Sequence, residues 1–287
     1  MVFAIQHVLS MESHGSKLHG MLYMPADNEP DAAWVICDPF AEEKKCAHRP
    51  LTDAARMLCA RGCAVLRFDY RGCGDSQGRF AEFTPHDWVE DLRVAATRLR
   101  QEAPGAPLGL AGLRMGCSMA HAVALEREDV RFLMLWEPII DGAAYVKQNL
   151  KRSMVKAMLT RGDDFAAEEV QSAREAEIID LDGYEVSPEA MRQLGDIGLA
   201  DKQSAFDGPL FVLNIGTRQE PGEAYGELAR RHAKGTAAGV RLEPFWNRIG
   251  LIDVNPMLEA TGLWLTQAVA GDSTEGCHTE AQPPGHG

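Results

Sequence analysis

The feature that most constrains this sequence is a regular alternation of short apolar runs with longer amphipathic stretches. Runs with the length and apolar character of strands occupy residues 3–9, 18–25, 34–40, 64–70, 107–113, 130–139, 209–217 and 240–246. Helices are expected at residues 48–62, 85–103, 116–127, 222–234 and 255–270. The first two strands are expected to form an antiparallel pair. Because the later strands alternate with helices, the pattern predicts an α/β fold with a mainly parallel eight-stranded sheet flanked by helices.

Residues 141–207 interrupt this alternation, because they show no strand pattern and are expected to be largely helical. They contain 14 acidic and 8 basic residues, and so carry −6 of the net charge of −13. An insertion between two core strands predicts a helical acidic lid, and a solvated acidic face without a role is the alternative. The expected domains are an α/β core at 1–140 and 208–271, the lid at 141–207, and a disordered polar tail at 272–287.

The charge balance restricts the partners. With 42 acidic against 29 basic residues, the chain lacks the basic patch with which nucleic-acid-binding proteins neutralise phosphates. No apolar run approaches the ~20 residues that cross a bilayer, and the N-terminus lacks the basic and apolar regions of a signal peptide. We therefore expect a soluble cytoplasmic protein that binds no nucleic acid and does not insert into membranes. A homodimer is compatible with this sequence.

The cysteines indicate no metal centre. The seven thiols are odd in number and form no C-x-x-C pair, and no second ligand pair lies near Cys59 and Cys63. Packed thiols in a reducing compartment explain this pattern. No metal and no cofactor are expected, since the Gly-rich turn at 71–78 matches neither common nucleotide-binding motif.

The strongest local signal is the turn from Gly112 to Gly116, which reads GLRMG between an apolar strand and a helix. This is the position and the glycine spacing of the G-x-S-x-G nucleophile elbow. Glycines are required there because the turn is so tight that its central residue adopts strained backbone angles. The side chain at the centre, residue 114, is therefore expected to stand exposed above the sheet.

The order of the elements, this elbow and the DYRGCGDS turn at 69–76 resemble the α/β-hydrolase superfamily up to about residue 270. More narrowly, the segments PFAEE at 39–43, LWEP at 135–138 and DGYE at 182–185 resemble the exosortase-system-associated hydrolases. These are encoded beside bacterial exopolysaccharide and protein-sorting genes. The resemblance implies an α/β-hydrolase fold, a bacterial source, and hydrolysis of an acyl ester or thioester in exopolysaccharide or lipid-linked metabolism.

The residues depart from this expectation at the catalytic positions. Arg114 occupies the nucleophile position, and a guanidinium remains protonated and cannot attack a carbonyl. Glu220 is the one candidate for the acid in the loop after the strand at 209–217. The loop after the next strand holds no histidine, because His232 falls inside a helix and His278 in the tail. An ordinary Ser-His-Asp triad is therefore not supported.

Two residues next to the elbow are candidates to replace the missing nucleophile. Cys117 lies near a helix N-terminus beside Arg114, an environment that lowers the pKa of a thiol. It lacks a histidine as proton shuttle, and a small packing residue is the favoured interpretation. Ser118 is more simply a residue of the first helical turn.

Arg114 also has a chemistry of its own. It projects a permanent, planar donor into the region above the strand ends, where ligands of open α/β sheets bind. In one hypothesis Arg114 forms an ion pair with Glu42 or Glu137, which closes the site where a hydrolase nucleophile would act. This outcome is slightly favoured. In the other, Arg114 binds a carboxylate, phosphate or sulfate of a ligand. The expected ligand-binding residues around the elbow are Phe40, Glu42, Glu43, Arg114, Met115 and Glu137.

Two functions remain open from the sequence. The first is a hydrolase of acyl esters or thioesters that uses a non-standard mechanism through Arg114, Cys117 or a lid residue. The second is a catalytically inactive hydrolase relative that binds an anionic ligand or a partner protein through the cleft and lid. The arginine at the elbow and the missing histidine favour the second, and the family resemblance favours the first by association.

Overall fold

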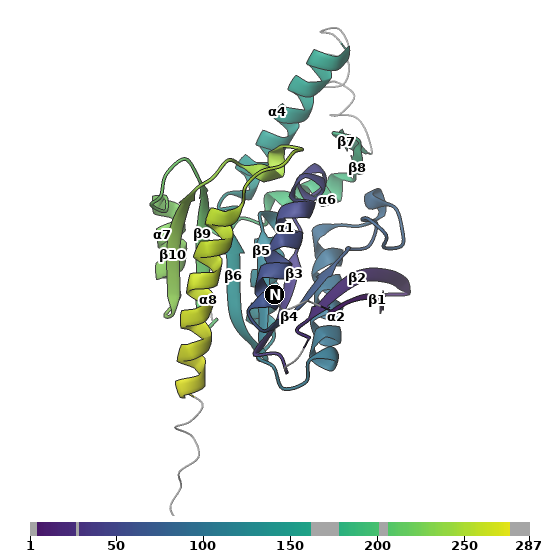
Figure 1. Cartoon of the computed structure of the whole chain (residues 1–287). Coiled ribbons are helices and arrows are strands. Elements are labelled where there is room, and N and C mark those ends of the chain that lie inside the picture. The colour runs from purple at the N-terminus through teal and green to yellow at the C-terminus, as the bar shows by residue number, and fades with distance from the viewer. Residues whose placement is uncertain (1–4, 27–28, 162–177, 201–205, 276–287) are drawn as a thin grey trace, which may run out of the picture.

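The computed structural model describes residues 5–26, 29–161, 178–200 and 206–275 (Figure 1). Its main sheet contains eight strands in the order β1-β2-β4-β3-β5-β6-β9-β10. The strands are β1 (Ile5–Ser13), β2 (Ser16–Met24), β3 (Ala32–Cys37), β4 (Cys63–Phe68), β5 (Leu108–Leu113), β6 (Val130–Trp136), β9 (Leu210–Gly216) and β10 (Gly235–Arg241). β1 and β2 pair antiparallel, β2 joins β4 antiparallel, and all later neighbours are parallel. The predicted mainly parallel eight-stranded sheet is confirmed.

Helices cover both faces of the sheet. They are α1 (Glu42–Ala60), α2 (Pro85–Glu102), α3 (Met115–Glu126), α4 (Gly142–Arg161), α6 (Pro188–Gly195), α7 (Glu223–Arg230) and α8 (Asn255–Glu275), with short 3₁₀ turns η1 (Phe80–Glu82) and η2 (Phe245–Asn247). The buried side chains divide into two clusters, one under α2, α3 and α7 and the other under α1 and α8. Neighbouring residues on β3 illustrate the division, since Trp34 belongs to one cluster and Val35 to the other. No described helix is both long enough and apolar enough to span a bilayer.

The start of α2 follows the sequence prediction closely. Thr84 precedes the helix, Pro85 is its first residue, and the carboxylate of Asp87 accepts hydrogen bonds from both the backbone N–H and the hydroxyl of Thr84 at 2.8 Å. This is the reciprocal arrangement that satisfies free donors at a helix N-terminus.

The last strand was predicted at the wrong place. β10 covers residues 235–241 and not 240–246, and the run at 240–246 instead ends in the 3₁₀ turn η2 after Pro244. β10 consists mostly of small residues because other chain segments approach its backbone closely. A Cβ on Gly235 would lie 2.0 Å from the carbonyl oxygen of Ala229, and one on Gly239 would lie 2.5 Å from the backbone of Glu220. Local apolarity does not reveal such a requirement.

Other predicted elements differ as well. α7 ends at Arg230 and not at 234, so that His232 lies outside the helix in which it was predicted. α1 begins at Glu42 and not at 48, so that Glu42 and Glu43 lie in its first turn, where the helix dipole favours carboxylates. α8 continues to Glu275 and so includes the first residues of the predicted tail at 272–287, while residues 276–287 lie outside the described part of the chain. The segment 141–207, predicted to lack strands, contains the hairpin of β7 (Ile179–Leu181) and β8 (Tyr184–Val186).

The segment between β6 and β9 leaves the carboxyl edge of the sheet. Figure 1 shows α4 projecting beyond the rest of the molecule, with the β7–β8 hairpin and α6 nearer the body. The base of α4 contacts the core, because Tyr145 is 3% exposed. The other half of α4 is exposed at Met154, Val155, Met158 and Leu159.

Candidate functional site

The elbow has the backbone that the sequence predicts. Arg114 links β5 to α3 with φ 55° and ψ −117°, a combination that only glycine adopts without strain. The flanking glycines are required by close packing. A Cβ on Gly112 would lie 2.3 Å from the backbone of Gly116, and one on Gly116 would lie 2.2 Å from the carbonyl oxygen of Cys37. Residue 114 is therefore held at the carboxyl end of the central strands by the packing of two elements.

The side chain of Arg114 is held by aromatic rings. Its guanidinium carbon lies 5.3 Å from the ring centre of Tyr145 on α4 and 5.2 Å from that of Trp246 in η2. The side chain is 13% exposed, and its Nε lies 3.6 Å from an Oε1 of Glu43. Nε is buried and has no hydrogen-bond partner among the described residues. The site is thus a permanent cation between two aromatic faces, with one carboxylate at ion-pair distance.

The carboxylate that pairs with Arg114 belongs to Glu43. The sequence prediction of Glu42 or Glu137 as this partner is wrong. Glu43 is 2% exposed in the first turn of α1, and the hydroxyl of Tyr145 donates a hydrogen bond to its Oε2 at 3.0 Å. Burial raises the pKa of Glu43, and the charge of Arg114 and the Tyr145 hydroxyl offset part of this effect. Glu42 is 19% exposed and pairs with Lys45 at 3.4 Å. The prediction chose the wrong neighbour because one residue turns a helix by about 100°.

Glu137 forms a separate network at the end of β6. Its carboxylate accepts hydrogen bonds from the Asn214 side chain at 2.9 Å, from the Ile215 backbone at 2.6 Å and from the Tyr225 hydroxyl at 2.7 Å. Glu137 is 8% exposed and has a φ of 48°. This carboxylate therefore ties β6 to β9 and α7, and it contributes negative charge near Arg114 through space.

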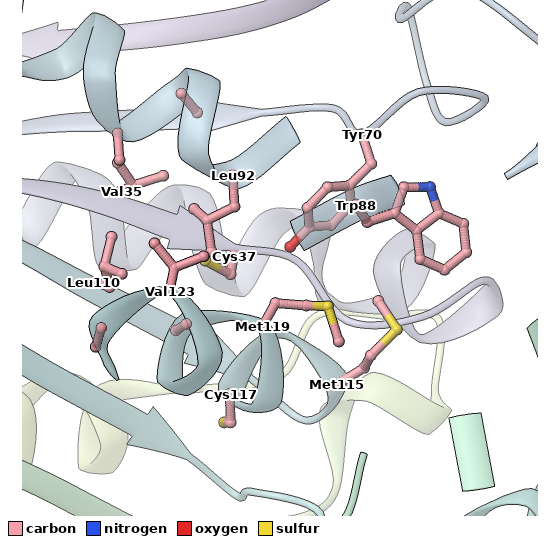
Figure 2. Packing of buried hydrophobic residues seen from close by; sticks show 14 of the residues in the cluster. Val35, Cys37, Tyr70, Trp88, Leu92, Leu110, Met115, Cys117, Met119 and Val123 are labelled. Atoms are coloured by element: carbon pink, nitrogen blue, oxygen red, sulfur yellow. The ribbon is translucent and has the colours of Figure 1, made fainter. Parts of the chain in front are cut away.

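Cys117 is a packed thiol. Its Sγ lies 3.0 Å from the carbonyl oxygen of Gly112 and 3.2 Å from that of Trp136. Figure 2 shows Cys117 on the side of α3 opposite to Met115 and Met119. Burial raises the pKa of the Cys117 thiol well above its usual value, so the lowered pKa expected from the helix N-terminus is wrong. The thiol is fully buried in the cluster under α2, α3 and α7, and solvent does not reach it.

The other predicted residues do not gather into a hydrolytic site. Ser118 is 2% exposed, and its hydroxyl donates to the carbonyl oxygen of Ile197 at 2.7 Å. Glu220 is exposed in the loop after β9. Phe40 and Met115 are buried, and Phe40 packs against Phe80 and Trp88 at ring-centre distances of 5.4 and 5.9 Å. Both present little surface to a ligand.

The histidines considered from the sequence are remote or outside the described residues. His232 follows α7, is 4% exposed, and packs its ring on His121 with 5.8 Å between ring centres. Burial lowers the pKa of His232. His278 lies outside the described residues. Within the described part of the chain, no group of three His, Cys, Asp or Glu side chains could hold a metal ion.

The sequence missed Tyr145 and Trp246, the two rings that hold Arg114. Tyr145 follows β6 by nine residues inside the segment interpreted as a lid, and Trp246 lies in the run mistaken for a strand. An arginine in place of a nucleophile is a reason to look for aromatic residues, because guanidinium groups stack on them. The sequence gives no indication of which aromatics these are.

The parallel sheet, with a strained turn between its central strand and the following helix, defines the α/β-hydrolase class. Within that class, the chain belongs to the S33 serine aminopeptidase family, whose model matches residues 28–176, just over half of the chain. No curated protein sequence matches the chain.

Similar solved structures include several esterases. Est1E from Butyrivibrio proteoclasticus, with ferulic acid bound, is 19% identical with a TM-score of 0.66, and covers 91% of this chain and 99% of its own. The esterase Pf2001 from Pyrococcus furiosus is 17% identical with a TM-score of 0.65, covering 93% and 92%. The esterase domain of a Rhodothermus marinus protein is 21% identical with a TM-score of 0.61, covering 92% and 99%. At these identities the likeness concerns the fold.

Proposed function

We propose that this α/β-hydrolase uses its elbow to bind an anionic ligand and does not hydrolyse acyl bonds. The observation that carries the proposal is Arg114 at the nucleophile position, a group that cannot lose its proton or attack a carbonyl. The ligand group is a carboxylate or a phosphate, because the planar guanidinium fork matches the oxygens of both.

The surroundings of Arg114 support binding over a closed ion pair. Its Nε lies 3.6 Å from Oε1 of Glu43, at ion-pair distance, and is buried without a hydrogen-bond partner among the described residues. The rings of Tyr145 and Trp246 fix the plane of the guanidinium without using its N–H groups. A cation whose plane is fixed in this way, with its Nε donor unpartnered among the described residues, is suited to receive the oxygens of an anion.

The groups that would perform covalent chemistry are engaged elsewhere. The hydroxyl of Ser118 donates to the backbone, and Cys117 is enclosed by two carbonyl oxygens. A thiol whose pKa is raised by burial supplies little thiolate. These contacts weigh against the hypothesis of a displaced nucleophile.

Hydrolysis of an acyl ester or thioester is the second candidate. It is favoured by the elbow backbone, which keeps the strained angles of a nucleophile turn, and by the esterases among the similar structures. The resemblance to the exosortase-system-associated hydrolases, and with it a bacterial and cytoplasmic setting, belongs to this proposal and rests on the sequence motifs alone. A homodimer and a partner protein likewise stay predictions.

We also propose that the segment 141–207 acts as a lid over Arg114. The support is that Tyr145, at the base of α4, lies against both Arg114 and Glu43. A ligand at Arg114 would then contact this segment as well as the core.

The test compares binding with turnover in the same preparation. We expect inorganic phosphate and acetate to raise the melting temperature of the wild type, and Arg114→Gln to abolish the shift because it keeps the stem and removes the charge. Arg56→Gln, on the exposed face of α1, is the matched control and should keep the shift. No hydrolysis of p-nitrophenyl acetate or butyrate above background is expected, and no labelling of Ser118 by a fluorophosphonate.

Two results would reverse the choice between the candidates. Ester turnover that a fluorophosphonate or iodoacetamide removes would establish the hydrolase. If anions raised the melting temperature equally in wild type and in Arg114→Gln, they would bind at a place other than the elbow.

A further inference from the structure

We infer that Glu43 is a second ligand-binding residue of the elbow, and that it takes up a proton when an anion binds Arg114. The site therefore accepts an anion together with a proton, which favours singly charged anions such as carboxylates over dianions. This inference rests on the proposed function and specifies the class of its ligand. It is carried by the position of Glu43 beside Arg114, by its burial and by the other charges around it.

Glu43 is placed to interact with any anion that Arg114 binds. Its Oε1 lies 3.6 Å from the Nε of Arg114, and its side chain is 2% exposed. That Nε is buried without a hydrogen-bond partner among the described residues, so an anion that engages it comes to lie beside the Glu43 carboxylate. Two like charges that share one cation in a buried site oppose each other's ionisation, and one of them takes up a proton.

Within the described residues, Arg114 already faces two carboxylates. Glu43 lies at ion-pair distance, and Glu137 acts on Arg114 through space. Arg152, which also acts on Glu43 through space, is paired with Asp182 at 3.6 Å. A bound anion thus adds negative charge to a region that is already negative and largely closed to water. Uptake of one proton restores the charge that the site has without its ligand.

The proton goes to Glu43 and not to Glu137. Three hydrogen bonds stabilise the ionised form of Glu137, whereas among the described residues one reaches Glu43, from the Tyr145 hydroxyl to Oε2 at 3.0 Å. Burial also raises the pKa of the Glu43 carboxyl. When protonated at Oε1, the oxygen nearer Arg114, Glu43 becomes a donor to an oxygen of the ligand while Oε2 still accepts from Tyr145.

The other groups around Glu43 come from several elements. Burial raises the pKa values of the Tyr145 and Tyr225 hydroxyls and of the Cys117 thiol, so these groups stay neutral near pH 7. The remaining charged or titratable neighbours are Glu42, Lys44 and Cys46 of α1, Arg114 at the elbow, Arg152 of α4 and Glu137 after β6, and η2 adds the uncharged Trp246 and Asn247.

The experiment measures the binding of methanesulfonate to the full chain by calorimetry. This anion stays ionised across the pH range used, so any proton that is taken up binds to the protein. Titrations at pH 7.2 in Bis-Tris and in Tris, two buffers that differ in ionisation enthalpy, give the number of protons taken up. We expect uptake that approaches one proton per anion. Sulfate, which carries a second charge, should bind at least fivefold more weakly than methanesulfonate.

The sign of the pH dependence follows from the same linkage. The anion raises the pKa of Glu43, so the complex holds more protons than the free protein, and affinity falls as pH rises, by up to about tenfold per pH unit. Glu43→Gln imitates the protonated carboxyl, because its amide oxygen still accepts from Tyr145 and its amide N–H donates. At pH 8.5 this variant should bind methanesulfonate about tenfold more tightly than wild type, with no proton uptake. A merely structural role of Glu43 predicts no such gain.

Glu126→Gln is the matched control, because it removes one carboxylate at the other end of α3, where Glu126 is 52% exposed and pairs with Arg93. It should keep the proton uptake and the pH dependence of the wild type.

The outcomes separate this inference from the function on which it rests. Binding that Arg114→Gln abolishes but that takes up no proton in wild type would overturn the inference and leave the anion site standing. Tighter binding of sulfate than of methanesulfonate, or weaker binding by Glu43→Gln at pH 8.5, would also overturn it. Binding that Arg114→Gln does not affect would remove the proposed function, and the inference with it. The wild-type titrations decide the question even where Glu43→Gln does not fold.

Discussion

At the scale of single residues, Arg114 combines a strained backbone with a side chain that has no nucleophilic chemistry. A φ of 55° with a ψ of −117° costs a non-glycine residue about 1–3 kcal/mol. The stacking on Tyr145 and Trp246 and the charge of Glu43 act in the opposite direction. The elbow thus keeps the strained backbone of its turn, but the central side chain, expected from the sequence to stand exposed, is 13% exposed and packed between two rings.

The strained backbone of Arg114 leads to a prediction that distinguishes the effect of the backbone on stability from the effect of the side chain. Both Arg114→Ala and Arg114→Gly remove the guanidinium, but only glycine relaxes the backbone. We expect Arg114→Gly to be more stable than Arg114→Ala by about 1–2 kcal/mol in the free energy of unfolding, measured by urea denaturation. As the control, the same pair of substitutions at Arg231, which has a φ of −72°, should show the opposite order, because glycine there only adds freedom to the unfolded chain. Equal stability of the two elbow variants would mean that the turn carries no strain.

The sequence predicted residue 114 correctly and its partner incorrectly. Glycine spacing is a local property and identifies the elbow. The choice between Glu42 and Glu43 depends on where α1 begins, and the start at Glu42 turns Glu43 inward. The rings of Tyr145 and Trp246 come from segments 31 and 132 residues further along the chain, and such contacts have no local signal.

At the scale of elements, α4 is attached through side chains between Tyr145 and Lys156, and Lys156 pairs with Asp182 at 3.2 Å. Tyr145 donates to Glu43 and stacks on Arg114, and the Arg152 side chain binds Asn247 in η2 and the Asn149 side chain. The second half of the helix is exposed. The hydrogen bonds of α4 to the core thus come from its first half, and changes there are expected to affect the whole helix.

This arrangement makes Tyr145→Phe informative. The substitution keeps the ring on Arg114 and removes the donor to buried Glu43, so that the carboxylate loses a hydrogen bond. We expect a loss of about 1–2 kcal/mol in the free energy of unfolding and faster trypsin cleavage after Lys147 and Lys151. Tyr184→Phe is the matched control, because Tyr184 packs its ring on Phe80 and its hydroxyl makes no hydrogen bond with the described residues. Equal cleavage rates in both variants would show that the Tyr145 hydroxyl does not hold α4.

Elements with strong local signals were predicted best. The capping residues of α2 and the apolar runs of the central strands are read directly from neighbouring residues. β10 and the β7–β8 hairpin were missed for opposite reasons. The small residues of β10 are set by the close approach of other segments, and the hairpin strands are only three residues each.

At the scale of the whole molecule, burial of thiols on both sides of the sheet links stability to alkaline pH. Burial raises the pKa of Cys63 and of Cys73 to about 12, and raises those of Cys37 and Cys117 further. The unfolded chain has thiols with the ordinary value near 9. Above that pH the unfolded state loses protons that the folded state retains, so folding becomes less favourable as pH rises.

The expected slope is large. Each such thiol contributes about 1.4 kcal/mol per pH unit between the unfolded and folded pKa values, and four give roughly 5 kcal/mol per unit. Urea denaturation at pH 8, 9.5 and 10.5 should therefore show a nearly constant free energy of unfolding below pH 8.5 and a steep fall above it. The double variant Cys63→Ala, Cys73→Ala should lower stability at pH 8 but reduce the alkaline slope by about 3 kcal/mol per unit. Val65→Ala truncates a buried side chain that does not titrate, and it should lower the whole curve without changing its slope. If the double variant kept the wild-type slope of unfolding free energy against pH, the loss of stability at alkaline pH would come from groups other than these thiols.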